Sequence, residues 1–195
     1  MQNKTKIKAI IFDCFGVLVQ GTLDRFQEKY FSHADDQTVE HFRDLSHASD
    51  KGVISYEDFV EAAADLAQIS VAEANRAFRD TPINTELFAY IRETLKPKYK
   101  IGLLSNIGSG RLAEALPEEQ LEVFDAKTLS FEAHFAKPEP EIYRLAAQKF
   151  DLDPRECLFV DDSNVNILGA QKVGMAGIVY QNFAKFREEL SEKLK

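Results

Sequence analysis

The sequence has few cysteines and no long apolar run, and each scarcity excludes a class of protein. Its 195 residues include only two cysteines, Cys14 and Cys157, and both lie in strand-like segments. We therefore expect buried structural thiols rather than a disulfide framework or a CxxC redox pair. The first apolar run, residues 7–19, is interrupted by a lysine, an aspartate and a glycine. It is too short and too polar for a membrane span or a signal-peptide core.

The chain also lacks a basic stripe. It carries 24 Lys and Arg residues against 32 Asp and Glu residues, for a net charge of −8 that is spread through the sequence. This balance argues against nucleic acid or an anionic membrane as the main partner, so an anionic substrate would need local positive charge. With 45% apolar residues the chain is expected to be globular and to have a cytoplasmic location.

The pattern of elements changes twice along the chain. Residues 7–13 are strand-like, whereas residues 23–79 carry only helical patterns, including one that Ser55 and Asp58 could cap. After Pro82, short apolar strands alternate with amphipathic helices, which predicts a parallel sheet covered on both faces. The later strands are expected near residues 100–104, 126–129, 157–160 and 176–180, and the helices near residues 86–95, 111–116, 139–150, 165–173 and 183–194.

Polar side chains follow several of these strands, at the edge where parallel sheets bind ligands. Each of them alone is an ordinary turn or cap residue. Three carboxylates at one edge, however, repel one another unless a cation compensates them, and magnesium prefers carboxylate, water and phosphate oxygens. The residues are Asp13, Ser105, Asn106, Lys137, Asp161 and Asp162.

The single lysine of this group suggests the chemistry. Beside a magnesium ion, a serine hydroxyl and backbone N–H groups, Lys137 would complete a pocket for a tetrahedral dianion. Asp13 would then be free to attack phosphorus. The pattern therefore indicates phosphoryl transfer.

Four motifs that span nearly the whole chain resemble those of the haloacid dehalogenase superfamily. FDCFGVL is similar to its first motif, LLSN to its second, AKPEPEIY to its third and FVDDSNVNILGAQKVGM to its fourth, in the same order and spacing. The resemblance implies an α/β fold, with a Rossmann-like parallel sheet, helices on both faces and a small all-helical cap inserted after the first strand. We expect residues 1–18 and 82–195 to form the catalytic core and residues 19–81 the cap.

The resemblance also implies a role for each matching residue. Asp13 would be the nucleophile that forms a phosphoaspartyl intermediate, and a magnesium ligand together with the backbone carbonyl of Phe15. Ser105 and the backbone of Asn106 would hold phosphate oxygens. Lys137 would steady the nucleophile and the phosphate.

The fourth motif would complete the metal site. Asp162 would bind Mg²⁺ directly, Asp161 would bind it through water or pair with Lys137, and Asn166 would support the loop. The expected substrate is a small phosphorylated metabolite, and the expected assembly a monomer or a homodimer.

Phe15 departs from the family pattern. Phosphatases of this family usually carry an aspartate two residues after the nucleophile, as general acid and then general base. A positioned acid or base contributes roughly two to four orders of magnitude in rate. We therefore expect a magnesium-dependent phosphomonoester hydrolase for small metabolites or sugars. It would either be restricted to leaving groups that need little protonation or borrow an acid from the cap. We expect a structural role for His134, which is also our best candidate for a substitute proton donor.

Two alternatives stay open at this point. Haloacid dehalogenases use no metal and carry an aromatic residue at this position, but Asp161 and Asp162 would repel a haloacid carboxylate. A weakly active or non-catalytic phosphate-binding or regulatory protein is the other alternative. The cap histidines, His33, His41 and His47, share no helical face and are expected at a solvated surface.

Overall fold

The strands form one parallel sheet in the computed structural model, which describes residues 6–195. The strand order is β3-β2-β1-β4-β5, with β1 at the centre. The α/β fold with a parallel sheet, predicted from the alternation of elements, is thereby confirmed. The strands are β1 (Ala9–Phe12), β2 (Lys100–Ser105), β3 (Ala126–Leu129), β4 (Cys157–Asp161) and β5 (Ala176–Val179).

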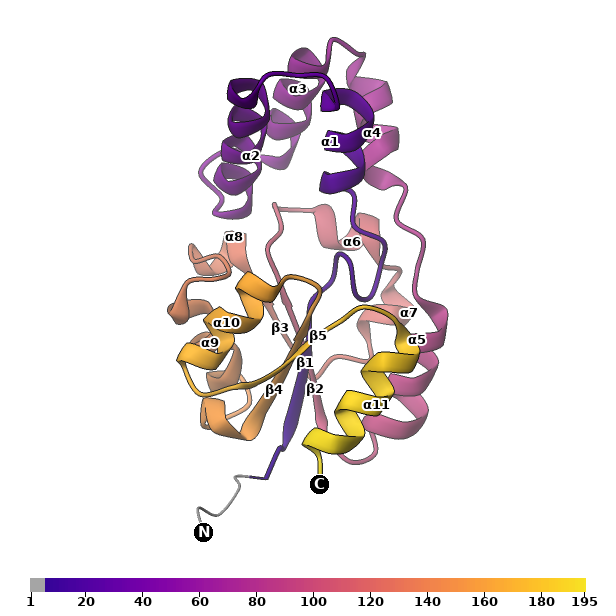
Figure 1. Ribbon diagram of the computed structural model, residues 1–195, viewed down its shortest axis with the longest axis vertical. Coiled ribbons are helices and arrows are strands. Elements are labelled where there is room, and N and C mark those ends of the chain that lie inside the picture. The colour runs from indigo at the N-terminus through magenta and orange to yellow at the C-terminus, as the bar shows by residue number, and fades with distance from the viewer. Residues whose placement is uncertain (1–5) are drawn as a thin grey trace.

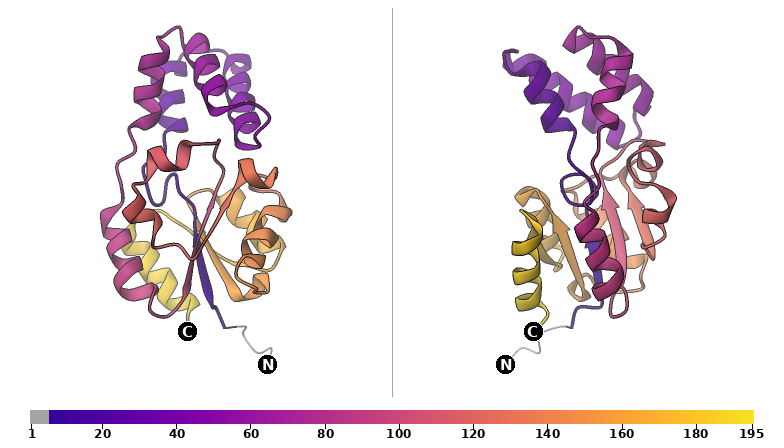
Figure 2. Two further views of the ribbon diagram at one scale, coloured as in Figure 1. Left: turned by 180° about the vertical axis from the view of Figure 1, so that it is seen from behind. Right: turned by 90° about the vertical axis from the view of Figure 1, so that its right-hand side faces the viewer.

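Helices cover both faces of the sheet, as Figures 1 and 2 show. Ile10 and Phe12 of β1 pack on one side with α5 and α11, whereas Ala9 and Ile11 pack on the other side with α9 and α10. A strand buried on both faces is apolar throughout, which explains the sequence AIIF. The core helices are α5 (Thr85–Tyr90), which continues as the π-helical turn η1 (Ile91–Leu95), α6 (Arg111–Ala115), α7 (Glu118–Leu121), α8 (Ser130–Ala133), α9 (Pro140–Gln148), the 3-10 turn η2 (Pro154–Glu156), α10 (Asn164–Lys172) and α11 (Phe183–Lys193).

Four helices between β1 and α5 form a separate layer above the sheet (Figure 1). They have their own aromatic core, in which the rings of Phe26 and Phe78 stack with their centroids 4.4 Å apart. Ser55 caps the third of these helices, with Asp58 completing the capping box, as the sequence predicts. We call this layer the cap; its proposed limits stay residues 19–81. The helices are α1 (Leu23–Phe31), α2 (Asp36–Asp50), α3 (Tyr56–Ala67) and α4 (Val71–Arg79).

A few local expectations need correction. Cys14 lies in the turn after β1 rather than in a strand, because the ladder ends at Phe12; both cysteines are nevertheless buried and free. The segment 86–95 is an α-helix that widens into a π-helical turn, and α7, α8 and η2 were not predicted because such short helices carry no periodic signal. Within residues 6–195, no helix has the length and apolar character needed to cross a bilayer.

Candidate active site

The carboxyl ends of β1, β2 and β4 meet directly below the cap. Phe12 of β1 is paired with Val160 of β4, so Asp13 and Asp161 are the next residues on two adjacent strands. The backbone N–H of Asp13 continues this pairing, donating to the Val160 carbonyl at 2.8 Å. The parallel register therefore brings together two carboxylates that are far apart in the sequence.

Lys137 lies between these two carboxylates. Its Nζ is 2.7 Å from Asp13 Oδ1 and 2.7 Å from Asp161 Oδ2, and the three side chains are 2%, 8% and 0% exposed. Although burial alone would lower the pKa of Lys137, the two carboxylates raise it above its ordinary value. The ammonium group therefore stays charged and holds both acids in place.

Asp161 is fully occupied by hydrogen bonds. Besides Lys137, its carboxylate accepts from the Ser163 backbone N–H at 2.8 Å and from Asn166 Nδ2 at 3.1 Å to each oxygen. Of the two roles that the sequence leaves open for Asp161, this arrangement suits the pairing with Lys137. Asn166 lies beside it, at the position from which it was expected to support the loop.

Asp13 has one oxygen engaged and one open. Oδ1 accepts from the Cys14 backbone N–H at 2.7 Å and from Lys137, whereas Oδ2 accepts no hydrogen bond from the described residues. Burial raises the pKa of Asp13 above its ordinary value, and the charge of Lys137 opposes this effect. Asp13 itself lines the cavity described below, so its unbonded oxygen is available to an electrophile that binds there.

The acidic groups fit a hard divalent cation. Asp13, Asp161 and Asp162 each offer a carboxylate oxygen, and these oxygens lie within 4.8 Å of one another. Burial, together with the charge of Asp161, raises the pKa of Asp162 to about 6. Gly16 lets Asp162 approach the turn after β1, because a Cβ at Gly16 would lie 2.0 Å from Asp162 Oδ2. A set of crowded carboxylate oxygens suits Mg²⁺.

The second and third motifs are joined by one side chain. Asn106 Oδ1 accepts from the Lys137 backbone N–H at 2.8 Å, and Asn106 Nδ2 donates to the Lys137 carbonyl at 3.0 Å. Ser105 is fully buried at the end of β2, with its hydroxyl 3.4 Å from the Asn106 carbonyl. The structure thus brings Ser105, Asn106 and Lys137 to the same edge as the acids.

A cavity of about 490 Å³ separates this edge from the cap. This volume is in the range of small-molecule sites. Residues from both parts of the chain line it, so the cap contributes directly to the site. The core provides Asp13, Phe15, Asn106, Arg111, Lys137 and Asp162, and the cap provides Ser46, His47, Ser49, Asp50 and Tyr56, among others.

Phe15 packs beneath a buried arginine that sequence reasoning missed. The Arg111 guanidinium lies 5.2 Å from the centroid of the Phe15 ring and 5.7 Å from that of Tyr56. Arg111 is 3% exposed, and its Nη2 donates to the Phe78 carbonyl in the cap. Three residues that line this cavity each have a buried polar atom with no hydrogen-bond partner among the described residues: Ser49 Oγ, Tyr56 Oη and Arg111 Nη1.

The four histidines differ in how they lie relative to the cavity. His134 does not line the cavity; its ring is exposed, and its Nδ1 lies 3.3 Å from the Lys51 carbonyl. This placement fits the structural role expected for His134 and does not suit the candidate role of a substitute proton donor. His33, His41 and His47 are exposed as expected, although His47 also lines the cavity.

The chain is similar in sequence to known hydrolases and phosphatases. A family model for haloacid dehalogenase-like hydrolases matches residues 7–174. A D-ribitol-5-phosphate phosphatase from Bacteroides thetaiotaomicron is 27% identical over 201 residues, covering 95% of this chain and 97% of that protein. A sesquiterpene phosphatase from Aspergillus oryzae is 26% identical over 180 residues, covering 89% of this chain and 90% of that protein.

Solved structures share the fold. A HAD family enzyme from B. thetaiotaomicron, in complex with magnesium and inorganic phosphate, has a TM-score of 0.71 and 25% identity, covering 92% of this chain and 98% of its own. An L-2-haloacid dehalogenase from Xanthobacter autotrophicus has a TM-score of 0.66 and 17% identity, covering 95% and 83%, which shows the fold alone. With its four motifs gathered at one edge of the sheet and a family match over most of its length, this chain belongs to the haloacid dehalogenase-like hydrolases.

Proposed function

We propose that this hydrolase is a magnesium-dependent phosphomonoesterase that acts through a phosphoaspartyl intermediate. The observation that carries the proposal is the buried trio of Asp13, Lys137 and Asp161, in which one oxygen of Asp13 accepts no hydrogen bond from the described residues and Asp13 lines the cavity. A carboxylate held by an ammonium group and open on one side is arranged as a nucleophile. Its natural target is an electrophile that also needs positive charge, as a phosphoryl group does.

In the first step, the transfer of the phosphoryl group to Asp13, each residue has its own role. Asp13 Oδ2 attacks phosphorus, while Lys137 orients Asp13 and interacts with a phosphoryl oxygen. Ser105 and Asn106 are the proposed ligands of the other phosphoryl oxygens. Mg²⁺, held by Asp13, Asp162 and the Phe15 carbonyl, would offset the negative charge that gathers between the carboxylates and the phosphoryl group.

The relatives support this proposal. The chain is similar over nearly its whole length to a D-ribitol-5-phosphate phosphatase, and it shares its fold with an enzyme in complex with magnesium and inorganic phosphate. Both point toward a small phosphorylated metabolite as the substrate.

The cap side of the cavity favours a hydroxyl-bearing leaving group, such as a polyol or a sugar. Ser49 and Tyr56 of the cap and the neighbouring Arg111 of the core each have a buried polar atom with no hydrogen-bond partner among the described residues, although Arg111 Nη1 lies 3.9 Å from Glu114 Oε2. An apolar leaving group would keep these atoms unpaired, at about 1–3 kcal/mol for each group that stays desolvated. Substrate hydroxyls would accept from Arg111 and exchange hydrogen bonds with the two protein hydroxyls.

The dehalogenase alternative is less well supported. Phe15 is aromatic, as is the residue at this position in haloacid dehalogenases. However, Asp162 and Asp50 line the cavity together with Asp13. These carboxylates would repel a haloacid carboxylate. Phosphate release and halide release from matched substrates separate the two activities.

Phosphate release by the purified protein tests the proposed function. A polyol or sugar phosphate should be hydrolysed only with Mg²⁺ present, and Asp13→Asn should eliminate the reaction, whereas Asp44→Asn on the exposed side of α2 should not. Activity that survives Asp13→Asn would exclude the aspartyl mechanism. Stabilisation by Mg²⁺ with beryllium fluoride, but without turnover of any phosphomonoester, would favour the non-catalytic alternative.

A further inference from the structure

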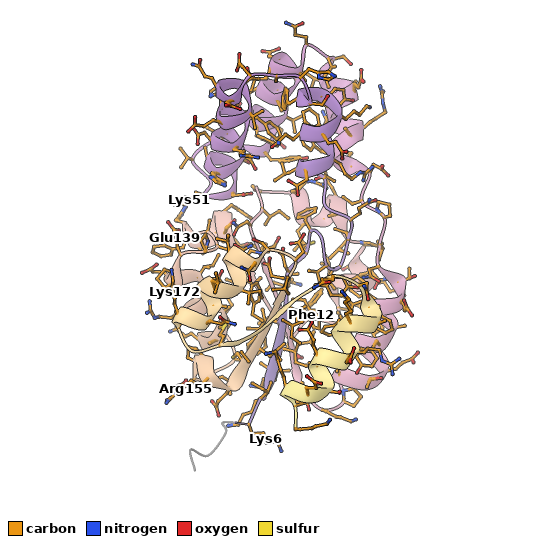
Figure 3. The ribbon with its side chains drawn as sticks, viewed as in Figure 1. Lys6, Phe12, Lys51, Glu139, Arg155 and Lys172 are labelled. Carbon is orange, nitrogen blue, oxygen red and sulfur yellow. The ribbon has the colours of Figure 1, made fainter. Side chains whose placement is uncertain are left out.

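The end of helix α2 is fixed directly above the candidate active site. Ser49 packs against the second-motif loop, where a Cβ on Gly108 would lie 2.6 Å from Ser49 Oγ. On the other side, Lys51 Nζ lies 2.7 Å from Glu139 Oε1 beside the third motif. Figure 3 shows Lys51 at the lower end of the cap and Glu139 at the top of the core beneath it. Asp50, between these two contacts, is thereby held at the cavity.

Asp50 lies at the same cavity as the reacting groups, and its carboxylate makes no interaction that would stabilise the fold. It lines the cavity together with Asp13, Phe15 and Lys137. No hydrogen bond or ion pair among residues 6–195 involves its carboxylate, although the residue is half-buried. A carboxyl group that is withdrawn from water and left unpaired is costly when it is ionised, so structure alone gives no reason for an acid here.

We propose that Asp50 is the general acid and general base of this enzyme, in place of the aspartate that Phe15 replaces. The inference rests on the proposed phosphatase function and deepens it. The Phe15 ring lies against the Arg111 guanidinium, so the position two residues after Asp13 offers no acid. The cap provides one from the opposite side of the same cavity.

The proposed reaction has two steps, and Asp50 transfers one proton in each. In the first, Asp13 Oδ2 bonds to phosphorus and the bond between phosphorus and the leaving oxygen breaks, leaving its electron pair on that oxygen. The Asp50 carboxyl gives its proton to this oxygen, so the alcohol departs neutral and Asp50 becomes a carboxylate. In the second, Asp50 takes a proton from water as the water oxygen bonds to phosphorus. The bond from phosphorus to Asp13 breaks, which releases inorganic phosphate, frees Asp13 and leaves Asp50 protonated again.

The surroundings of Asp50 are suited to both roles. Burial raises the pKa of Asp50 to about 7, and the charge of Lys137 opposes this effect. A group whose pKa lies near neutrality can give a proton in one step and accept one in the next.

Other titratable groups face this end of α2. His47 lies one turn before Asp50 and also lines the cavity, so it is the competing proton donor. From the core, Lys137 and the acids Asp13 and Asp162 face the cavity from below. Lys51 and Glu139 pair with each other, and His134 contacts the Lys51 carbonyl; none of these three lines the cavity.

Leaving groups of different basicity test the proposal. An alkyl phosphate such as a polyol phosphate needs a proton on its departing oxygen, whereas p-nitrophenyl phosphate releases a stable phenolate. In rapid-quench assays, Asp50→Asn should slow phosphoryl transfer from the polyol phosphate by roughly 10²–10⁴-fold. The nitrophenolate burst should change less than about tenfold, and the phosphoenzyme should then accumulate because its hydrolysis lacks a base.

Matched variants make the result specific. Asp50→Glu should recover part of the lost rate, while His47→Gln and Asp44→Asn, on the same helix, should keep the wild-type ratio between the two substrates. Stabilisation of Asp50→Asn by Mg²⁺ with beryllium fluoride checks that its site is intact.

Three results overturn the proposal. An equal loss of phosphoryl transfer from both substrates would indicate a structural role, and no loss with either would exclude Asp50 from the chemistry. A leaving-group effect seen with His47→Gln instead would assign the proton to His47. Wild-type protein that releases no phosphate from any phosphomonoester would instead refute the proposed function itself, so the two failures are distinguishable.

Discussion

Lys51 of the cap and Glu139 of the core form an ion pair across the boundary between the two layers, with Lys51 Nζ 2.7 Å from Glu139 Oε1. The other oxygen of Glu139 accepts from the backbone N–H of Ala136, next to Lys137. One carboxylate thus connects the end of α2 to the loop that carries the buried lysine. The ion pair links the position of the cap to the geometry of the site.

Lys51→Met should therefore change activity more than stability. The side chains of Lys51 and Glu139 are 39% and 38% exposed, and pairs this exposed contribute about 0–1 kcal/mol. Loss of the ion pair should nevertheless raise KM for a polyol phosphate, because part of the substrate's binding energy must then be spent on ordering the cap. Steady-state kinetics and thermal melts on Lys51→Met and on the exposed control Lys98→Met measure both effects. A KM equal to that of the control would separate this ion pair from cap closure.

Tyr56→Phe should weaken the use of a hydroxylated substrate without lowering the stability of the protein. The Tyr56 hydroxyl is buried without a hydrogen-bond partner in the described part of the chain, so its removal breaks no hydrogen bond of the free protein. We expect the free energy of unfolding to stay the same or to rise. The kcat/KM for a hydroxylated substrate should fall about 2–12-fold, which corresponds to one hydrogen bond of about 0.5–1.5 kcal/mol. Chemical denaturation and kinetics check the two halves; a clear loss of stability would show that the hydroxyl is paired in the free protein.

The edge of the sheet could be predicted from the sequence because strand ends in a parallel sheet meet by geometry. Asp13, Ser105 and Asp161 each follow or end a short apolar run, and that local signal was sufficient to gather them. Lys137 was identified by its chemistry, as the single lysine among the polar residues that the sequence places at this edge.

The cap side of the cavity could not be predicted in this way. Which face of α2 or α3 meets the core depends on how the cap docks, and no local pattern encodes that. Asp50 and Tyr56 therefore look like ordinary helix-end residues in the sequence. His134 shows the converse error: it is near Lys137 in sequence, but it ends α8 with a φ of 56° and its ring turns to the Lys51 carbonyl.

The pH dependence of phosphoryl transfer should report Asp50. Because burial raises its pKa to about 7, the proton-donating form is present below that pH and is lost as the pH rises through it. Single-turnover rates with a polyol phosphate should thus fall above about pH 7 in the wild type. In Asp50→Asn the rate should be low and should lose this alkaline decline, whereas His47→Gln should keep it. An unchanged alkaline decline in Asp50→Asn would assign the titration to another group.

The same titration predicts a gain in stability on substitution. A carboxyl group whose pKa is raised by folding weakens the folded state once the pH exceeds its unfolded pKa, and most strongly above the folded value. Asp50→Asn should therefore be more stable than the wild type at pH 8, and the difference should shrink toward pH 4. Denaturation midpoints at the two pH values measure this, with Asp44→Asn as the control. Equal differences at both pH values would contradict the raised pKa.

Gly16→Ala tests the metal site by filling the space that Asp162 needs. Gly16 has a φ of 88°, and a Cβ there would lie 2.0 Å from Asp162 Oδ2, so the carboxylate must move away from the turn that carries Asp13. Gly110 is a matched control, because its φ is 79° and a Cβ there would have no neighbour within 4 Å. Both substitutions should cost about 1–2 kcal/mol through the left-handed backbone.

Only Gly16→Ala should also weaken magnesium binding. The stabilisation of the folded protein by added Mg²⁺ depends on its affinity, so the increase in Tm with Mg²⁺ should shrink or vanish in Gly16→Ala and remain in Gly110→Ala. Isothermal titration of Mg²⁺ into both variants gives the affinities directly. If Gly16→Ala bound Mg²⁺ as tightly as Gly110→Ala, Asp162 would not be a ligand that depends on this turn, and the proposed set of Asp13, Phe15 and Asp162 would have to be revised.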